Sequence, residues 1–97
     1  MSVEIGQVYS ETDPRQAGRT VEVMEIVGVV GAAYAIVRLN TPARNVGKNA
    51  IGRKTRIRVD RLDGGQDYEL SDVEPYRFGT HRETGEIGYY PRSELRG

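Results

Sequence analysis

Apolar residues along this chain recur in short alternating runs that are interrupted by glycine and by turn-forming residues. Alternation with a period of two is typical of half-buried β-strands. It predicts strands over residues 5–9, 19–27, 33–39, 53–60 and 68–70, and then a hairpin that joins 76–78 to 87–90 through a tip at 83–86. In the second strand the alternation slips between Val23 and Met24, which indicates either a β-bulge or a strand that wraps a barrel and packs on both sides.

Five short strands, with a long polar loop after the first, predict an all-β fold: a small SH3-like barrel of about five strands with a C-terminal hairpin extension. The 97 residues suffice for one domain with a modest core. We expect residues 1–75 to form the barrel and residues 76–97 to form an extension packed on the same domain. An OB-fold is the second choice, because it normally has a helix between strands that the pattern does not indicate.

The chain has no net charge, yet its basic residues are concentrated in one segment. Between residues 38 and 61 there are eight basic residues and a single acid, Asp60. The basic residues are Arg38, Arg44, Lys48, Arg53, Lys54, Arg56, Arg58 and Arg61. Because a local field, more than the net charge, determines which partners are attracted, this segment is the first candidate for a binding site.

Within the segment, alternation places Lys54, Arg56 and Arg58 on one face of a strand, about 6.5–7 Å apart. That spacing is close to the roughly 6–7 Å between neighbouring phosphates of a nucleic-acid strand. The predicted nucleic-acid or anion-binding residues are therefore this row and the cations around it: Arg44, Lys48, Arg53, Lys54, Arg56, Arg58 and Arg61.

A second interpretation of the same row is more common for a strand of this kind. The cations would form a solvated face that pairs with acids across the sheet and protects an edge. The acids available for such pairing are Glu22, Glu25, Asp67 and Glu69. A third interpretation assigns the row to an acidic protein partner.

The C-terminal segment carries a local aromatic group made of Phe78, Tyr89 and Tyr90. It can close one end of the barrel, which is the commoner role for such residues, or form a hydrophobic surface for protein docking.

Other chemistry is absent from the sequence. There is no cysteine, and His81 is the single histidine, so we expect neither a metal site nor a cofactor. No nucleophile lies beside a base in any recognisable pattern, and we expect a protein that is not an enzyme. The longest near-apolar run, residues 26–37, is shorter than the roughly 20 residues of a membrane helix. With no secretory signal, the expected location is the cytoplasm.

Five short motifs resemble a group of small, largely uncharacterised proteins of actinobacteria and their phages. They are Gly6–Tyr9, Asp13–Arg15, Gly18–Val21, Gly52–Leu62 and Tyr68–Leu70. The resemblance implies a phage-encoded accessory protein, located in the bacterial host, that binds nucleic acid or a host protein. We therefore expect a binding module that contacts nucleic-acid backbone. The alternatives are a protein-interaction module or a structural phage component, and the oligomeric state is left open.

Overall fold

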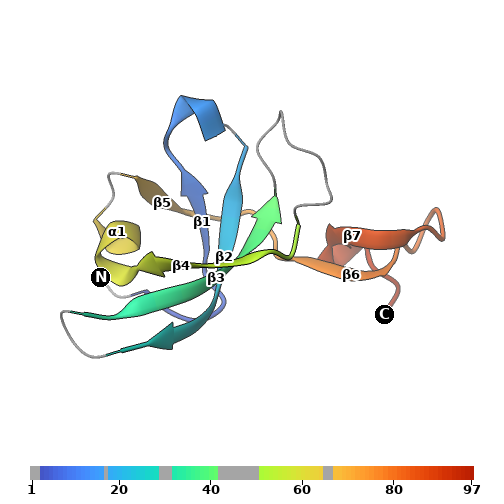
Figure 1. The fold of residues 1–97 in the computed structure, drawn as a ribbon. Helices are drawn as coiled ribbons and strands as arrows, with labels where there is room; N and C mark the ends of the chain where they lie inside the picture. The colour runs from blue at the N-terminus through green and yellow to red at the C-terminus, as the bar shows by residue number, and fades with distance from the viewer. Residues whose placement is uncertain (1–2, 17, 29–31, 42–50, 65–66) are drawn as a thin grey trace.

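The computed structural model describes residues 3–16, 18–28, 32–41, 51–64 and 67–97. Five antiparallel strands form a curled half-barrel sheet in the order β4-β3-β2-β1-β5, and two more form a separate hairpin (Figure 1). The sheet strands are β1 (Val8–Glu11), β2 (Thr20–Val27), β3 (Tyr34–Thr41), β4 (Lys54–Arg58) and β5 (Tyr68–Ser71). The hairpin strands are β6 (Tyr76–Thr80) and β7 (Ile87–Pro91). The prediction of a mostly-β fold around a curled five-stranded sheet is confirmed.

The core lies on the inner, concave face of the sheet. Alternate residues of the central strands are buried there, because side chains of a strand point to its two faces in turn. The buried cluster consists of Val3, Tyr9, Val21, Val23, Ala35, Val37, Leu39, Ile57, Leu62 and Tyr68. Within the described ranges, three short helical segments connect or end the strands: η1 (Pro14–Gln16), α1 (Val59–Asp63) and η3 (Arg92–Glu94).

Of the two explanations for the slip in β2, the structure shows the β-bulge. Val23 pairs with Val37 of β3, but the next pair is Glu25 with Ile36, so Met24 is an extra residue on β2. In a regular strand, residues three apart point to opposite faces. The bulge therefore brings both Glu22 and Glu25 to the outer, convex face of the sheet.

The prediction of a strand that runs to Asp60 is wrong at its end. β4 ends at Arg58, and the helix α1 begins at Val59. The reason is a packing requirement: residues three apart share one face of a helix, and this spacing directs both Val59 and Leu62 toward the core. Leu62 is buried in the core and Val59 packs against it.

The first strand also begins later than the alternation predicts. Gly6 lies in a turn with a φ of 95°, a left-handed conformation that favours glycine. Its N–H donates a hydrogen bond of 2.8 Å to the Val23 carbonyl. β1 consequently starts at Val8, and Ile5 is exposed.

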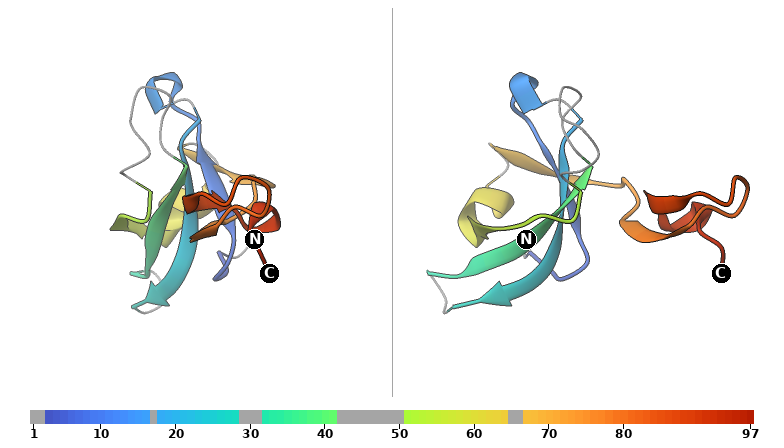
Figure 2. Two further views of the ribbon diagram at one scale, coloured as in Figure 1. Left: turned by 90° about the vertical axis from the view of Figure 1, so that its right-hand side faces the viewer. Right: turned by 45° about the vertical axis from the view of Figure 1, so that its right-hand side comes forward.

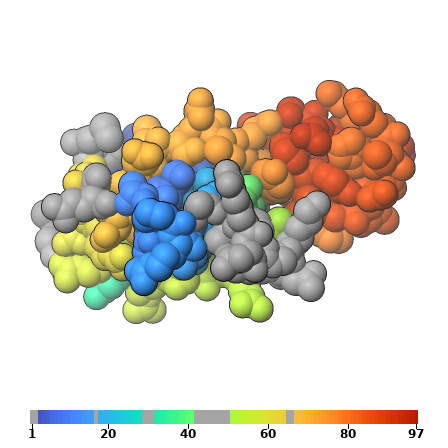
Figure 3. All heavy atoms as spheres, turned by 90° about the horizontal axis from the view of Figure 1, so that it is seen from above, coloured from blue at the N-terminus to red at the C-terminus, as the bar shows by residue number. Residues whose placement is uncertain are grey.

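The hairpin projects from the sheet and gives the molecule an elongated shape, with Cα extents of 45 × 28 × 20 Å (Figure 2). In the space-filling view its atoms, coloured orange and red, form a lobe at one end (Figure 3). An ionic group centred on a buried carboxylate, here called the junction cluster, joins this lobe to the sheet. It consists of Glu22 on β2, Arg38 on β3 and Arg77 on β6.

Glu22 is the centre of the junction cluster and only 3% exposed. Arg77 donates two hydrogen bonds to its carboxylate, of 2.7 and 2.8 Å. Arg38 lies 3.7 Å from the same carboxylate and donates to the Tyr76 carbonyl. Its guanidinium also lies 5.7 Å from the ring centre of Tyr89. The outer face of β2 and β3 is therefore closed by the hairpin at this end.

A buried amide completes the attachment. Asn40 is fully buried, and its side chain donates to Thr20 Oγ1 and to the Glu74 carbonyl at 3.1 Å each. Its carbonyl oxygen accepts a hydrogen bond of 2.7 Å from the Tyr76 N–H. Because every polar atom of this amide has a partner, its burial fixes where the chain enters β6.

We expect Glu22→Gln to lower the free energy of unfolding by about 3 kcal/mol, because it leaves two arginines beside a neutral group. The matched control is Glu25→Gln, on the same strand but exposed, with an expected change within about 0.5 kcal/mol. Urea unfolding of both variants measures the difference. Equal effects would contradict the central role of Glu22.

Burial raises the pKa of the Tyr9 and Tyr68 hydroxyls above the ordinary value near 10. The folded state therefore keeps these protons at a pH where the unfolded chain releases them. Their contribution to stability is complete below pH 10 and is lost as the pH rises above it. We expect the urea concentration at the unfolding midpoint to decrease as the pH is raised from 9 to 11. The decrease should be smaller in Tyr68→Phe. An equal fall in both proteins would show that Tyr68 is not responsible.

Candidate nucleic-acid interface

The basic row predicted from the sequence lies along an edge of the sheet. Lys54, Arg56 and Arg58 are all exposed residues of β4. In the described part of the chain, β4 pairs with β3 alone, so its other side is an unpaired edge. We call Lys54, Arg56 and Arg58 the basic row. Its register with β3 places it on the outer face, with Lys54 opposite Arg38 and Arg56 opposite Ile36.

The acids expected to neutralise this row from across the sheet lie elsewhere. Glu22 belongs to the junction cluster. Glu25 is on β2, and β3 separates it from the basic row. Glu69 is on β5, at the opposite edge of the sheet. Among the described residues, neither Lys54 nor Arg56 forms an ion pair.

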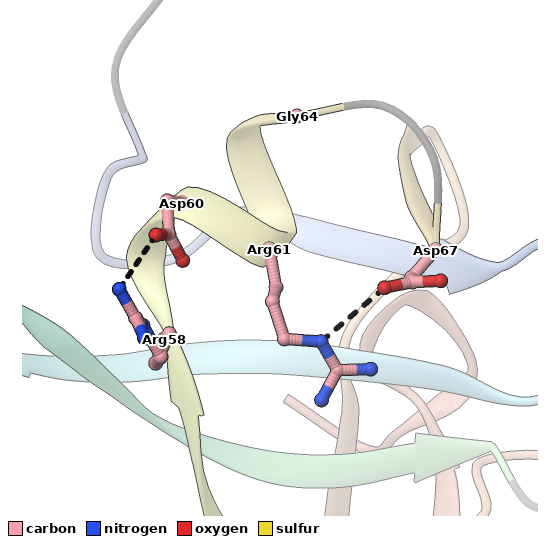
Figure 4. A pocket seen from close by; sticks show the side chains of 5 residues that line it. All are labelled: Arg58, Asp60, Arg61, Gly64 and Asp67. Atoms are coloured by element: carbon pink, nitrogen blue, oxygen red, sulfur yellow. Dashed lines mark hydrogen bonds and ion pairs between the residues drawn. The ribbon is translucent and has the colours of Figure 1, made fainter.

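Two local ion pairs do form where β4 passes into α1. Arg58 lies 2.9 Å from Asp60, and Arg61 lies 3.3 Å from Asp67. With Gly64 these residues line a hollow of about 340 Å³ beside the helix (Figure 4). All four charged side chains are more than half exposed, and exposed pairs of this kind are weak, about 0–1 kcal/mol each. An incoming anion therefore competes for both arginines at little cost.

The remaining predicted cations divide into two groups. Arg53 is exposed and directly precedes β4, and its carbonyl accepts a hydrogen bond of 2.7 Å from the Leu39 N–H. Arg44 and Lys48 lie outside the described residues. Five of the seven predicted cations thus lie in the described segment 51–64, three of them on β4 and Arg61 on α1.

An aromatic side chain lies beside the basic row, although none occurs within β4 itself. Tyr34 of β3 is directly opposite Arg58, and the Arg56 guanidinium lies 5.5 Å from the centre of its ring. Alternation along the sequence indicates only that Tyr34 shares a face of its strand with Ile36 and Arg38. It does not find this contact, because the signal lies in the register between β3 and β4.

The three aromatic residues predicted for docking do not form one surface. Phe78 pairs with Tyr89 across the hairpin, and their rings meet edge to face with centres 5.3 Å apart. Tyr90 points to the opposite face, where its ring packs on that of His81 with ring centres 4.7 Å apart. Phe78 is 66% exposed and its face also carries Ile87, which is 72% exposed. One face of the hairpin is therefore apolar and open.

His81 has a structural environment in the hairpin. Its Nε2 lies 3.0 Å from a Glu94 carboxylate oxygen, and its Nδ1 accepts hydrogen bonds from the N–H groups of Glu83 and Thr84. These contacts hold the turn after β6 against the C-terminal segment. Over the residues that the structure describes, no three acidic or histidine side chains are placed to hold a metal ion.

None of the helices in the described part of the chain has the length and apolar character that crossing a membrane requires. No protein-family model, curated protein or solved structure matches this chain.

Removing the two local acids tests the strength of the pairs around the hollow. We expect the double variant Asp60→Asn with Asp67→Asn to have a free energy of unfolding within about 1–2 kcal/mol of that of the parent protein, because both pairs are exposed. It should also elute from a cation-exchange column at higher salt than the control Asp72→Asn with Glu83→Gln. The control changes net charge equally at two exposed acids elsewhere. If the double variant and the control eluted at the same salt concentration, removal of Asp60 and Asp67 would not have made Arg58 and Arg61 more available to the column.

Proposed function

We propose that this chain is a non-enzymatic module that binds the backbone of a nucleic acid through the basic row, with Arg53 and Arg61 in support. One observation carries the proposal: three exposed cations stand at alternate positions of an unpaired edge strand, and two of them have no acid partner among the described residues. A row with free charges retains a field that can attract phosphates.

The proposed contact is with phosphate rather than with base edges. Arginine and lysine contacts to phosphate supply affinity and fix orientation, but they carry little sequence information. They also release condensed counterions, so affinity falls as salt rises. We therefore expect binding that depends strongly on ionic strength and weakly on sequence.

We further assign the fold to the SH3-like barrels. The strand order β4-β3-β2-β1-β5, in which β1 to β4 are neighbours in chain order and β5 returns beside β1, supports this assignment. The resemblance to proteins of actinobacteria and their phages supports an accessory role in a bacterial cytoplasm.

A second candidate function is favoured by the hairpin. Phe78 and Ile87 on its open face are large apolar side chains with more than half of their surface exposed. Such groups are common where one protein docks on another. This candidate predicts a partner whose binding survives charge reversal of the basic row.

The central test is fluorescence anisotropy with a labelled nucleic acid at 50 and 200 mM salt. If the three cations of the basic row each contact one phosphate of a duplex, affinity falls about 40-fold between these salt concentrations. The variant Lys54→Glu, Arg56→Glu, Arg58→Glu should lose binding at both concentrations.

The matched control is Arg82→Glu, Arg92→Glu, Arg96→Glu, which makes the same change in net charge at exposed positions of the C-terminal lobe. We expect it to bind within a few-fold of the parent protein. Equal losses in both variants would point to net charge alone and would contradict a site on β4. Absence of binding by the parent protein at 50 mM salt would remove the nucleic-acid function.

A further inference from the structure

An aromatic side chain, Tyr34, lies beside the end of the basic row that Arg58 occupies. Tyr34 is 37% exposed and faces the same side of the sheet as Arg56 and Arg58. The Arg56 guanidinium lies 5.5 Å from the centre of the Tyr34 ring. An exposed ring and an exposed guanidinium plane are therefore held together beside two phosphate-binding side chains.

A second arginine–tyrosine contact shows what is distinctive about this one. The Arg61 guanidinium lies 5.7 Å from the ring of Tyr68, but Tyr68 is only 5% exposed because it belongs to the core. A base cannot reach that ring. Tyr34, in contrast, is on the outer face and 37% exposed, with the Arg56 guanidinium over its ring.

The outer face changes character from its edge inward. β4 contributes three cations, β3 contributes Tyr34 and the half-buried Ile36, and β2 contributes the exposed Val27 opposite Tyr34. The acid Glu25 lies farther in, opposite Ile36. Phosphates are favoured over β4 and disfavoured near Glu25, whereas flat apolar groups are favoured over β3. This order fits a strand whose backbone follows β4 and whose bases turn toward β3.

A duplex cannot place its backbone along β4 and turn its bases toward β3, because its bases are stacked on one another inside the helix. Single strands present unstacked bases, which proteins bind on aromatic rings and on arginine planes. We propose that the outer face binds single-stranded nucleic acid in preference to duplex, with phosphates along the basic row and one base stacked on the Tyr34–Arg56 pair. This inference rests on the proposed function and adds the class of nucleic acid to it.

The experiment compares a labelled oligo-dT 12-mer with a labelled 12-base-pair duplex, by anisotropy at 50 mM salt. The parent protein should bind the single strand more tightly. Tyr34→Ala should weaken that binding about 5- to 160-fold, the range for loss of one stacked base. Binding of the duplex should change less than about twofold, since the phosphate contacts are retained.

Tyr34→Phe is the matched control, because it keeps the ring and should keep single-strand affinity within about twofold. Tyr34→Leu keeps an apolar side chain of moderate size without a ring, and replaces the alanine variant if that one melts at a lower temperature than the parent. We expect Tyr34→Leu to reduce the affinity for the single strand as much as Tyr34→Ala does.

The outcomes separate the two proposals. Tighter duplex binding by the parent, or equal losses for both ligands in Tyr34→Ala, would overturn the single-strand inference and leave backbone binding intact. Failure of the parent to bind either ligand would overturn the proposed function and this inference with it.

Discussion

The arrangement of this molecule depends on the buried carboxylate of Glu22. A carboxylate this deeply buried must be paired, because an isolated buried charge is very costly, and its partners come from two parts of the chain. Arg38 is its cross-strand neighbour on β3, and Arg77 reaches it from the hairpin. The same contact therefore attaches the C-terminal lobe and closes one end of the outer face. A two-stranded hairpin is marginally stable alone, so this attachment supplies the support that its own strands lack.

The junction cluster also determines which charges are left without an ion-pair partner among the described residues. Glu22 is committed to Arg38 and Arg77, and the strand order keeps Glu25 and Glu69 away from β4. The bulge at Met24 turns Glu25 to the outer face, which also carries the basic row, but β3 lies between them. The concentration of cations in the sequence consequently becomes a concentration of charge in space, which strand alternation alone does not guarantee.

Alternation in the sequence was sufficient to locate β2, β3, β4 and β5, and to place Lys54, Arg56 and Arg58 on one face. It failed where local pattern and packing disagree. Val59 continues the alternation of β4, yet the need to bury Leu62 turns the chain into α1. Alternation also does not predict which side chains meet between strands. The pairing of Glu22 with Arg77 and the contact of Arg56 with Tyr34 both depend on register and topology, which no single segment encodes.

Charged side chains on an edge strand have a protective role, because they discourage pairing with another chain. That role explains why an exposed edge such as β4 carries lysine or arginine, but it does not explain the whole arrangement. A single inward-pointing charge or a bulge is enough for protection, whereas β4 carries three cations in register and has a tyrosine beside two of them. Protection also gives no reason for an exposed ring next to the edge, since an uncovered aromatic side chain favours association. The combination of free cations and an exposed ring is better explained by a ligand that is anionic along its backbone and flat at its bases.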